Sequence, residues 1–298
     1  MTKKLPLFIM TYGNSGTGKT TDCGYSFPNA LFIANSGALH SVRNICGYEP
    51  SAVHCDTVED IITLLTKMKQ SNGQHKFDAI VIDDFAFMME KSIGLRGSKK
   101  PNLDMRDWGY INKLALEFRK ILSEIPESMG LHVILNCWEK PPKTTNEGHF
   151  IRGGAQLHGK LPDMFASLPD MVLRCGIDNM RKGWNGIYIC SNDRNYATKD
   201  RLNICYKLKP IPMNLREILH AAGYKLSRHP TLSWQAEAVE AITAQLNDST
   251  DPLSLANTLY SGLLEKGIAP TAARWTMRDA LDRHVIQTAL HQSDRTFI

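Results

Sequence analysis

The chain has 298 residues, of which 43% are hydrophobic and 22% are charged, and its formal net charge is +5 at pH 7. This composition is ordinary for a globular protein, and no apolar run approaches the length of a membrane span. The charge is uneven, because residues 229–298 hold more acidic than basic side chains. The basic remainder, residues 1–228, suits a polyanionic partner.

The cysteines argue against a zinc site or a disulfide framework. There are seven of them, and no two form a C-x-x-C pair. An odd number without paired spacing is typical of buried free thiols in a reducing cytoplasm.

A glycine-rich stretch lies close to the start of the chain. The apolar run 5–11 predicts a buried strand, and the segment after Lys19 can be helical up to Pro28. Between them, residues 13–20 read GNSGTGKT, which in a strand–turn–helix context predicts a phosphate site. The residues assigned to it are Gly13, Asn14, Ser15, Gly16, Thr17, Gly18, Lys19, Thr20 and Thr21.

The chemistry of a phosphate site explains these residue types. Glycines let the backbone turn tightly and bring its N–H groups against phosphate oxygens. The following helix presents the positive end of its dipole to the same anion. Lys19 adds a positive charge for the outer phosphates, and the Thr20 hydroxyl can bind Mg²⁺.

The next elements lead to a pair of acidic residues. Residues 31–34 predict a second strand, and Val53–His54 a very short third one. Thr57 caps a helix, with Asp60 as its capping-box partner. The run 77–84 predicts a buried strand that ends in two acids. We assign Asp83 to Mg²⁺, as in the Walker B arrangement, while Asp84 orients water or begins the next turn.

Two basic stretches without apolar periodicity follow. Residues 92–107 predict a mobile basic loop with Arg96, Lys99 and Lys100, the alternative being a solvated surface loop. A core-facing helix is predicted over 107–123. The strand 132–136 ends in Asn136, whose polar side chain is expected to face the ligand crevice of an α/β sheet, with Glu139 just beyond.

The second basic stretch covers residues 140–160 and contains Lys140, Lys143 and Arg152. A loop this long inside a compact domain is usually functional or disordered. Further strands are predicted over 171–177, 186–191 and 201–207.

From Asn214 onward the pattern predicts helices. Asn214 and the pair Asp251–Pro252 are expected helix starts, and glycines follow the expected ends. The linker 226–230 divides a core of residues 1–228 from a helical region of residues 229–298. The helical region is either a cap on the core or a module for oligomerisation or partner docking.

Taken together, these residues resemble the RecA-like ATPases. The resemblance rests on the phosphate loop, residues 31–39, the run Ile80–Asp84, Ile134–Asn136, and the stretch Ala197–Arg201. It covers roughly residues 5–210, as a matter of element order. Within the family, the chain is most similar to short phage proteins that assist single-strand annealing and recombination.

The resemblance implies an α/β fold with a mostly parallel sheet. It implies ATP and Mg²⁺ bound between neighbouring protomers of a ring or filament, in the cytoplasm of a bacterial host. The two basic stretches would face single-stranded DNA, bound more through its backbone than its bases. Lys199 and Arg201 would reach the γ-phosphate of a neighbour, the alternative being a salt bridge where a strand begins. A single-strand-binding or other recombination protein is a further expected partner.

One position departs from the family pattern. RecA-like enzymes carry a glutamate just after the second strand, where it activates the attacking water, and Ser36 stands there in this chain. Hydrolysis therefore depends on another acid, for which Asp84 and Glu139 are the candidates. Alternative functions are a packaging or helicase-type motor, a small-molecule kinase, and a non-hydrolysing switch or scaffold.

Overall fold

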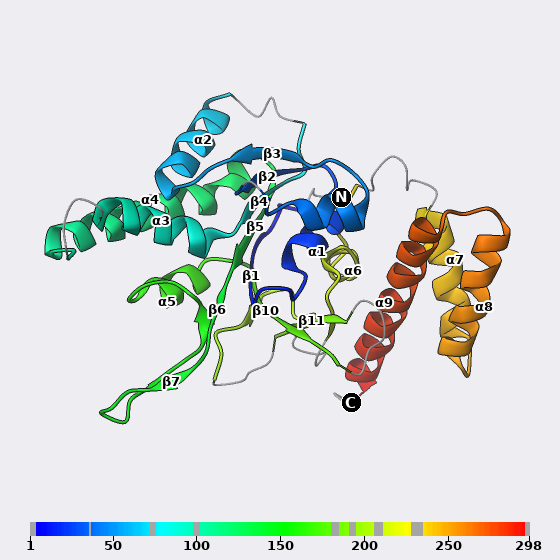
Figure 1. Cartoon of the computed structure of the whole chain (residues 1–298). Coiled ribbons are helices and arrows are strands. Elements are labelled where there is room, and N and C mark those ends of the chain that lie inside the picture. The colour runs from blue at the N-terminus through cyan, green and yellow to red at the C-terminus, as the bar shows by residue number, and fades with distance from the viewer. Residues whose placement is uncertain are drawn as a thin grey trace.

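A mostly parallel β-sheet runs through the centre of the chain, with helices against both of its faces (Figure 1). The computed structural model describes residues 4–35, 37–71, 76–97, 102–179, 185–190, 195–205, 211–227 and 235–295. The predicted α/β class, with a mostly parallel sheet and helices at the C-terminal end, is confirmed.

The strand order of the sheet is β13-β11-β10-β1-β5-β4-β2-β3, and β12 pairs with β10. The pairs formed among β1, β2, β3, β4 and β5 are all parallel, as is the pair β1–β10. The strands are β1 (Phe8–Tyr12), β2 (Ala30–Ala34), β3 (Ser51–His54), β4 (Ala79–Asp83), β5 (His132–Cys137), β10 (Met171–Ile177), β11 (Gly186–Ile189), β12 (Lys199–Asp200) and β13 (Ile211–Pro212).

Burial explains why the central strands read as continuous apolar runs. Every residue of β1, β2, β4 and β5 is buried, because helices cover both faces. Since these strands are parallel, their carboxyl ends meet at one edge of the sheet. The glycine-rich stretch, Asp83 and Asn136 all follow or end such strands.

Helices cover both faces of the sheet, and further helices pack on the last helix at the C-terminal end. Their bounds are α1 (Lys19–Ser26), a π-helix η1 (Val42–Cys46), α2 (Val58–Gln70), α3 (Phe85–Gly97), α4 (Met105–Ser128), α5 (Leu161–Ala166), α6 (Leu215–Ala221), α7 (Gln235–Asn247), α8 (Pro252–Glu265) and α9 (Pro270–Arg295). The predicted caps are confirmed: Thr57 and Asp60 form a capping box, and the Asn214 and Asp251 side chains cap α6 and α8.

Alternate side chains of β1 enter two different cores. Phe8, Met10 and Tyr12 pack in a cluster with residues of α2, α3, α4 and α5. Ile9 packs on the opposite face, with residues of α1, α6 and the late part of α9. The sheet is therefore the middle of three layers, and α1 is on the same face as α9.

The helices α7, α8 and α9 enclose a third, smaller apolar cluster. Helix α9 belongs to two clusters, since Met277 and Ala280 pack in the small one while Ile286 packs against the sheet. The predicted boundary at residue 228 falls on residues 228–234, outside the described residues, and stays a prediction. No helix in the described parts of the chain is long and apolar enough to cross a membrane.

Two predicted stretches are wrong in part. Residues 92–97 continue helix α3, because buried Ser92 accepts a hydrogen bond from Val58 N at 2.9 Å and fixes the helix to the start of α2. Helix α4 starts at Met105, because Asp104 and Asp107 form a capping box. The predicted strand 201–207 is absent over 201–205, where the Asp200 carboxylate accepts hydrogen bonds from the backbone of a turn. Residues 206 and 207 lie outside the described residues.

The predicted loop 140–160 contains a β-hairpin that projects from the sheet (Figure 1). At its base, β6 (Glu139–Lys140) pairs with β9 (Gly154–Ala155). Further out, β7 (Lys143–Thr144) pairs with β8 (Phe150–Ile151). Helices α3 and α4 extend to the same side of the sheet as this hairpin.

Candidate functional site

The loop 13–18 connects β1 to α1 at the carboxyl edge of the sheet. Gly18 has φ of 98°, in the left-handed region that residues with a side chain rarely adopt. A Cβ at Gly13 would lie 2.7 Å from the carbonyl oxygen of Cys175, so the loop can pass β10 this closely only with glycine. The shape of the loop thus depends on the glycines of the sequence motif.

Lys19 holds its ammonium group inside this loop. Its Nζ donates to the carbonyl oxygen of Gly13 at 2.7 Å and to that of Asn14 at 3.0 Å. The residue is 8% exposed, so the charge is largely shielded from water. A phosphate group that enters the loop would meet this charge already in place.

Thr20 and Asp83, the predicted Mg²⁺ ligands, are in direct contact. Thr20 Oγ1 donates to Asp83 Oδ2 at 2.7 Å, and Asn136 Nδ2 donates to Asp83 Oδ1 at 2.9 Å. Thr11 Oγ1 in turn donates to Asn136 Oδ1 at 2.7 Å. Burial raises the pKa of Asp83, while the bonds from Asn136 and Thr20 act in the opposite direction. The hydroxyl and the carboxylate are oxygen donors of the kind that Mg²⁺ takes.

Asp84 is the second acid at this edge. Burial and, after it, the negative charge of Asp83 raise the pKa of Asp84 to about 7. Its Oδ1 accepts a hydrogen bond from Ala86 N at 3.0 Å, which fixes the carboxyl group at the start of α3. A carboxyl group with a pKa near neutrality can accept or give a proton under physiological conditions.

These groups line one cavity of about 650 Å³, within the usual range for a small-ligand site. The cavity brings the phosphate loop together with both acids, as the sequence predicts. Its lining residues are Ser15, Gly16, Gly18, Lys19, Thr20, Thr21, Asn35, Ala38, Ser41, Ile45, Asp83, Asp84, Phe87 and Trp138.

The sequence analysis missed six of these lining residues: Asn35, Ala38, Ser41, Ile45, Phe87 and Trp138. The Oδ1 atom of Asn35 is buried and has no hydrogen-bond partner among the described residues, so it offers an acceptor to a ligand or a water. Phe87 and Trp138 face each other edge to face at 6.1 Å between ring centroids. Asn35 directly precedes Ser36, which lies outside the described residues. The position of Asn35 directly after the buried strand β2 was the sequence signal that could have identified Asn35 as a site residue.

Glu139, the other candidate base, forms an ion pair with Arg174 and is not among the residues that line the cavity. Its carboxylate accepts two hydrogen bonds from Arg174, at 2.9 and 3.0 Å, and is 7% exposed. The Arg174 guanidinium also lies 3.7 Å from the centre of the Tyr196 ring. The structure thus places Asp84 in the cavity with Lys19, and Glu139 in an ion pair at the base of the hairpin.

The predicted DNA-contacting residues are distributed over two projections. Arg96 is in the last turn of α3, where Nε donates to Asp107 at 3.0 Å and the guanidinium lies over the Tyr110 ring. Lys140, Lys143 and Arg152 belong to the hairpin segment, where the last two are exposed. Lys99 and Lys100 lie outside the described residues.

Lys199 and Arg201 lie far from the phosphate loop of their own chain. The register places Lys199 opposite Val172, and Asp170 bonds Phe8 N at the amino end of β1. Lys199 Nζ donates to the carbonyl oxygen of Ser167 at 2.7 Å, and Arg201 pairs with Asp170 at 3.2 Å. Because the loop follows the opposite end of β1, neither residue can serve it within one chain.

Comparison with known families gives a match over most of this architecture. A family model described as AAA domain matches residues 5–202. The matched range holds the phosphate loop, both acids, the hairpin and β12, whereas α7, α8 and α9 lie beyond it. A comparison with curated proteins finds no match to the chain.

Proposed function

Because the chain belongs to the AAA domain family of P-loop NTPases, we propose that it binds and hydrolyses ATP and that the nucleotide controls its binding of single-stranded DNA. The process in which we propose that it acts is phage recombination or replication, and the compartment is the cytoplasm of the bacterial host. The observation that carries the nucleotide part is the cavity in which Lys19, the Thr20–Asp83 pair and Asp84 meet.

Each group of residues in the cavity has a separate role in hydrolysis. The loop N–H groups and Lys19 hold the phosphates, and Thr20 and Asp83 hold Mg²⁺, which neutralises phosphate charge when bound. Asp84 accepts a proton from the attacking water as the water oxygen bonds to the γ-phosphorus. The bond from that phosphorus to the bridging oxygen breaks, and ADP leaves with the electron pair. Asn35 lines the same cavity, and its Oδ1 is a buried acceptor without a partner among the described residues, to which we assign a hydrogen bond from this water.

The hairpin supports the DNA part of the proposal. Lys143 and Arg152 are exposed cations suited to a phosphate backbone, and Phe150 is 52% exposed beside them. An exposed aromatic ring offers a face on which a base can stack. Trp138 lines the nucleotide cavity and directly precedes β6, so a change in the cavity has a short route to the hairpin.

The proposal includes assembly with further copies of the chain, in which Lys199 and Arg201 would leave their own-chain partners Ser167 and Asp170. These two cations can reach a γ-phosphate only if it belongs to a neighbouring protomer, as in a ring or filament. We therefore include a homo-oligomer in the proposal, with a single-strand-binding or other recombination protein as a further partner.

The test is binding of a labelled single-stranded oligonucleotide without nucleotide, with ATP, and with a non-hydrolysable analogue, each with Mg²⁺. We expect the tightest binding with the analogue, weakened by salt, and loss of the nucleotide effect in Lys19→Ala. Equal affinity in all three conditions would contradict nucleotide control. No binding in any of them would remove DNA from the proposal and favour a small-molecule kinase or a protein-docking switch.

A further inference from the structure

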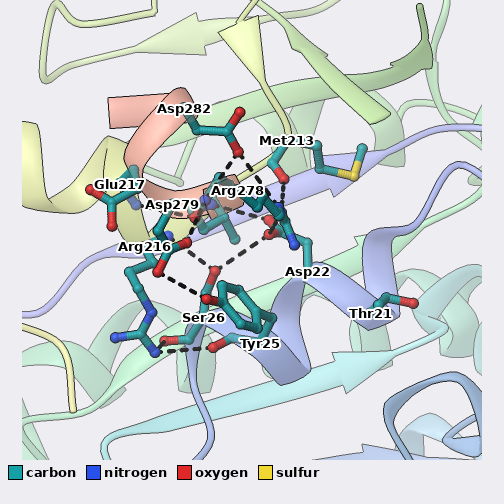
Figure 2. Close-up of polar contacts among 12 residues, drawn as sticks. Thr21, Asp22, Tyr25, Ser26, Met213, Arg216, Glu217, Arg278, Asp279 and Asp282 are labelled. Carbon is teal, nitrogen blue, oxygen red and sulfur yellow. Dashed lines mark hydrogen bonds and ion pairs between the residues drawn. The ribbon is translucent and has the colours of Figure 1, made fainter. Parts of the chain in front are cut away.

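The side of helix α1 that faces away from the cavity is bonded to a buried network of charged residues (Figure 2). Asp22 follows the cavity residues Thr20 and Thr21 but points the other way, and it is fully buried. Its carboxylate accepts hydrogen bonds from Tyr188 Oη at 2.7 Å and from Leu215 N at 3.1 Å. It also accepts one from Arg278 Nη2 of α9 at 3.1 Å.

Arg278 is one of the α9 residues that reach α1, together with Trp275 and Asp279. Its side chain is 7% exposed, and besides Asp22 it donates to the carbonyl oxygen of Met213. Its guanidinium lies 5.0 Å from the centre of the Tyr25 ring and 4.9 Å from that of Trp275. Arg278 Nε also lies 3.5 Å from Asp282 Oδ2 on its own helix. A buried charge is stable only where it is paired and hydrogen-bonded, so Arg278 helps to fix Asp22 together with Tyr188 and Leu215.

Neighbouring contacts tie the same helix to α6 and α9. Tyr25 Oη donates to Asp279 Oδ2 at 2.9 Å. Arg216 of α6 donates to the carbonyl oxygens of Tyr25 and Ser26, both at 3.0 Å. Helix α1 has only eight residues and no side-chain cap at its start, so these contacts from outside set its orientation.

We propose that Arg278 is a positioning residue for the phosphate loop. Through Asp22 it holds the helix whose first turn carries Lys19 and Thr20, and it thereby couples the helices α7, α8 and α9 to the nucleotide. This inference rests on the proposed nucleotide binding. Since coupling between two sites is reciprocal, bound nucleotide must also stabilise the contact between α1 and α9.

A matched pair of variants tests the inference. Arg283 is one turn further along α9 and forms a buried two-bond ion pair with Glu217 of α6, at 2.6 and 3.1 Å. Both Arg278→Met and Arg283→Met remove a buried guanidinium of α9 from an ion pair, but only Arg278 contacts Asp22. Affinity for Mg²⁺–ADP would be measured by titration calorimetry at a temperature where circular dichroism shows both variants folded.

We expect Arg278→Met to weaken ADP binding by roughly tenfold, toward the lower end of the range for coupled sites, and Arg283→Met to leave it within about twofold of wild type. Arg278→Lys, which keeps the charge, should recover part of the loss. Equal losses in the two Met variants would show a general packing effect and overturn the inference. So would unchanged affinity in Arg278→Met.

A second measurement needs no variant and covers the case in which Arg278→Met does not fold. Hydrogen exchange of the wild type would be followed with and without Mg²⁺–ADP. We expect ADP to slow exchange in the part of α9 around Arg278 and to leave α8 unchanged. Unaltered exchange in α9, in protein that binds ADP, would overturn the coupling alone. Wild-type protein that binds no nucleotide would overturn the proposed function and the inference with it.

Discussion

In the cavity at the phosphate loop, the polar side chains around Asp83 hold one another. Thr20 bonds Asp83, Asn136 bonds Asp83 from the other side, and Thr11 bonds Asn136. In the β7–β8 hairpin, by contrast, the cations and Phe150 are in contact with solvent, and two short pairs of strands hold the backbone together.

This difference separates two kinds of site. A buried network acts in one geometry, so changing a member should affect chemistry sharply. An exposed surface acts through the sum of weak contacts, so changing a member should have a graded effect and leave stability almost unchanged. The predictions that follow test this contrast, from the largest expected effect to the smallest.

The largest effect is expected inside the cavity. Asp84→Asn removes the proposed proton acceptor and keeps the size of the side chain, so ATP hydrolysis should fall by roughly 100-fold or more. Binding of Mg²⁺–ADP should persist, since Lys19, Thr20 and Asp83 remain. The measurements are steady-state phosphate release and ADP titration. Full hydrolysis in the variant would exclude Asp84 as the base and return Glu139 to consideration.

A smaller effect is expected from pH. Burial and Asp83 raise the pKa of Asp84 to about 7, and the base must be ionised to accept a proton. Hydrolysis, measured as kcat/KM, should therefore rise with pH, and saturating Mg²⁺ should move that rise to lower pH, because a cation held by Thr20 and Asp83 offsets the negative charge that helps to raise the pKa of Asp84.

Stability should change with pH in the opposite sense. The folded state holds the Asp84 proton more tightly than the unfolded chain does, so this group lowers stability as pH rises from about 4 to 7. Asp84→Asn should accordingly raise Tm relative to wild type more at pH 8 than at pH 5. A flat pH profile of kcat/KM together with an unchanged Tm difference would contradict the raised pKa.

The smallest effect is expected in the hairpin. The double variant Lys143→Ala/Arg152→Ala should weaken binding of single-stranded DNA several-fold and lower the slope of log affinity against log salt by about 1.4. Tm and ADP affinity should stay at wild-type values, because both side chains are exposed. The pair Lys113→Ala/Lys120→Ala on the exposed face of α4 is a matched control. An equal loss in the control pair would show non-specific electrostatic attraction instead of a hairpin site.

The parts of the structure that the sequence could predict are those with local causes. The motif of residues 13–20 fixes its own turn, and an apolar run that ends in Asp83 places that acid beside it. Asn35 has a weaker local signal, because the comparison with RecA-like enzymes points to the next position, Ser36, where those enzymes carry a glutamate. The hairpin has a local signal in Gly148, which has φ of 81°, whereas the composition of residues 140–160 alone predicts a loop.

Other contacts have no local signal at all. Asp22 and Arg278 are 256 positions apart, and nothing in the spacing near either residue indicates a buried ion pair. Likewise, Glu139 reads as a free acid after a strand until the fold brings Arg174 against it. Such pairs are products of topology, so pattern analysis of one sequence cannot find them.

The most direct test of the account is a calorimetric titration of ATP into wild-type protein and into Lys19→Ala, with Mg²⁺ and with a chelator. We predict one site per chain in the wild type, tighter with Mg²⁺. Lys19→Ala should lose about 2 kcal/mol of binding free energy, roughly 30-fold in Kd. Equal binding by the two proteins, or no binding by the wild type, would contradict the claim that this cavity is a nucleotide site.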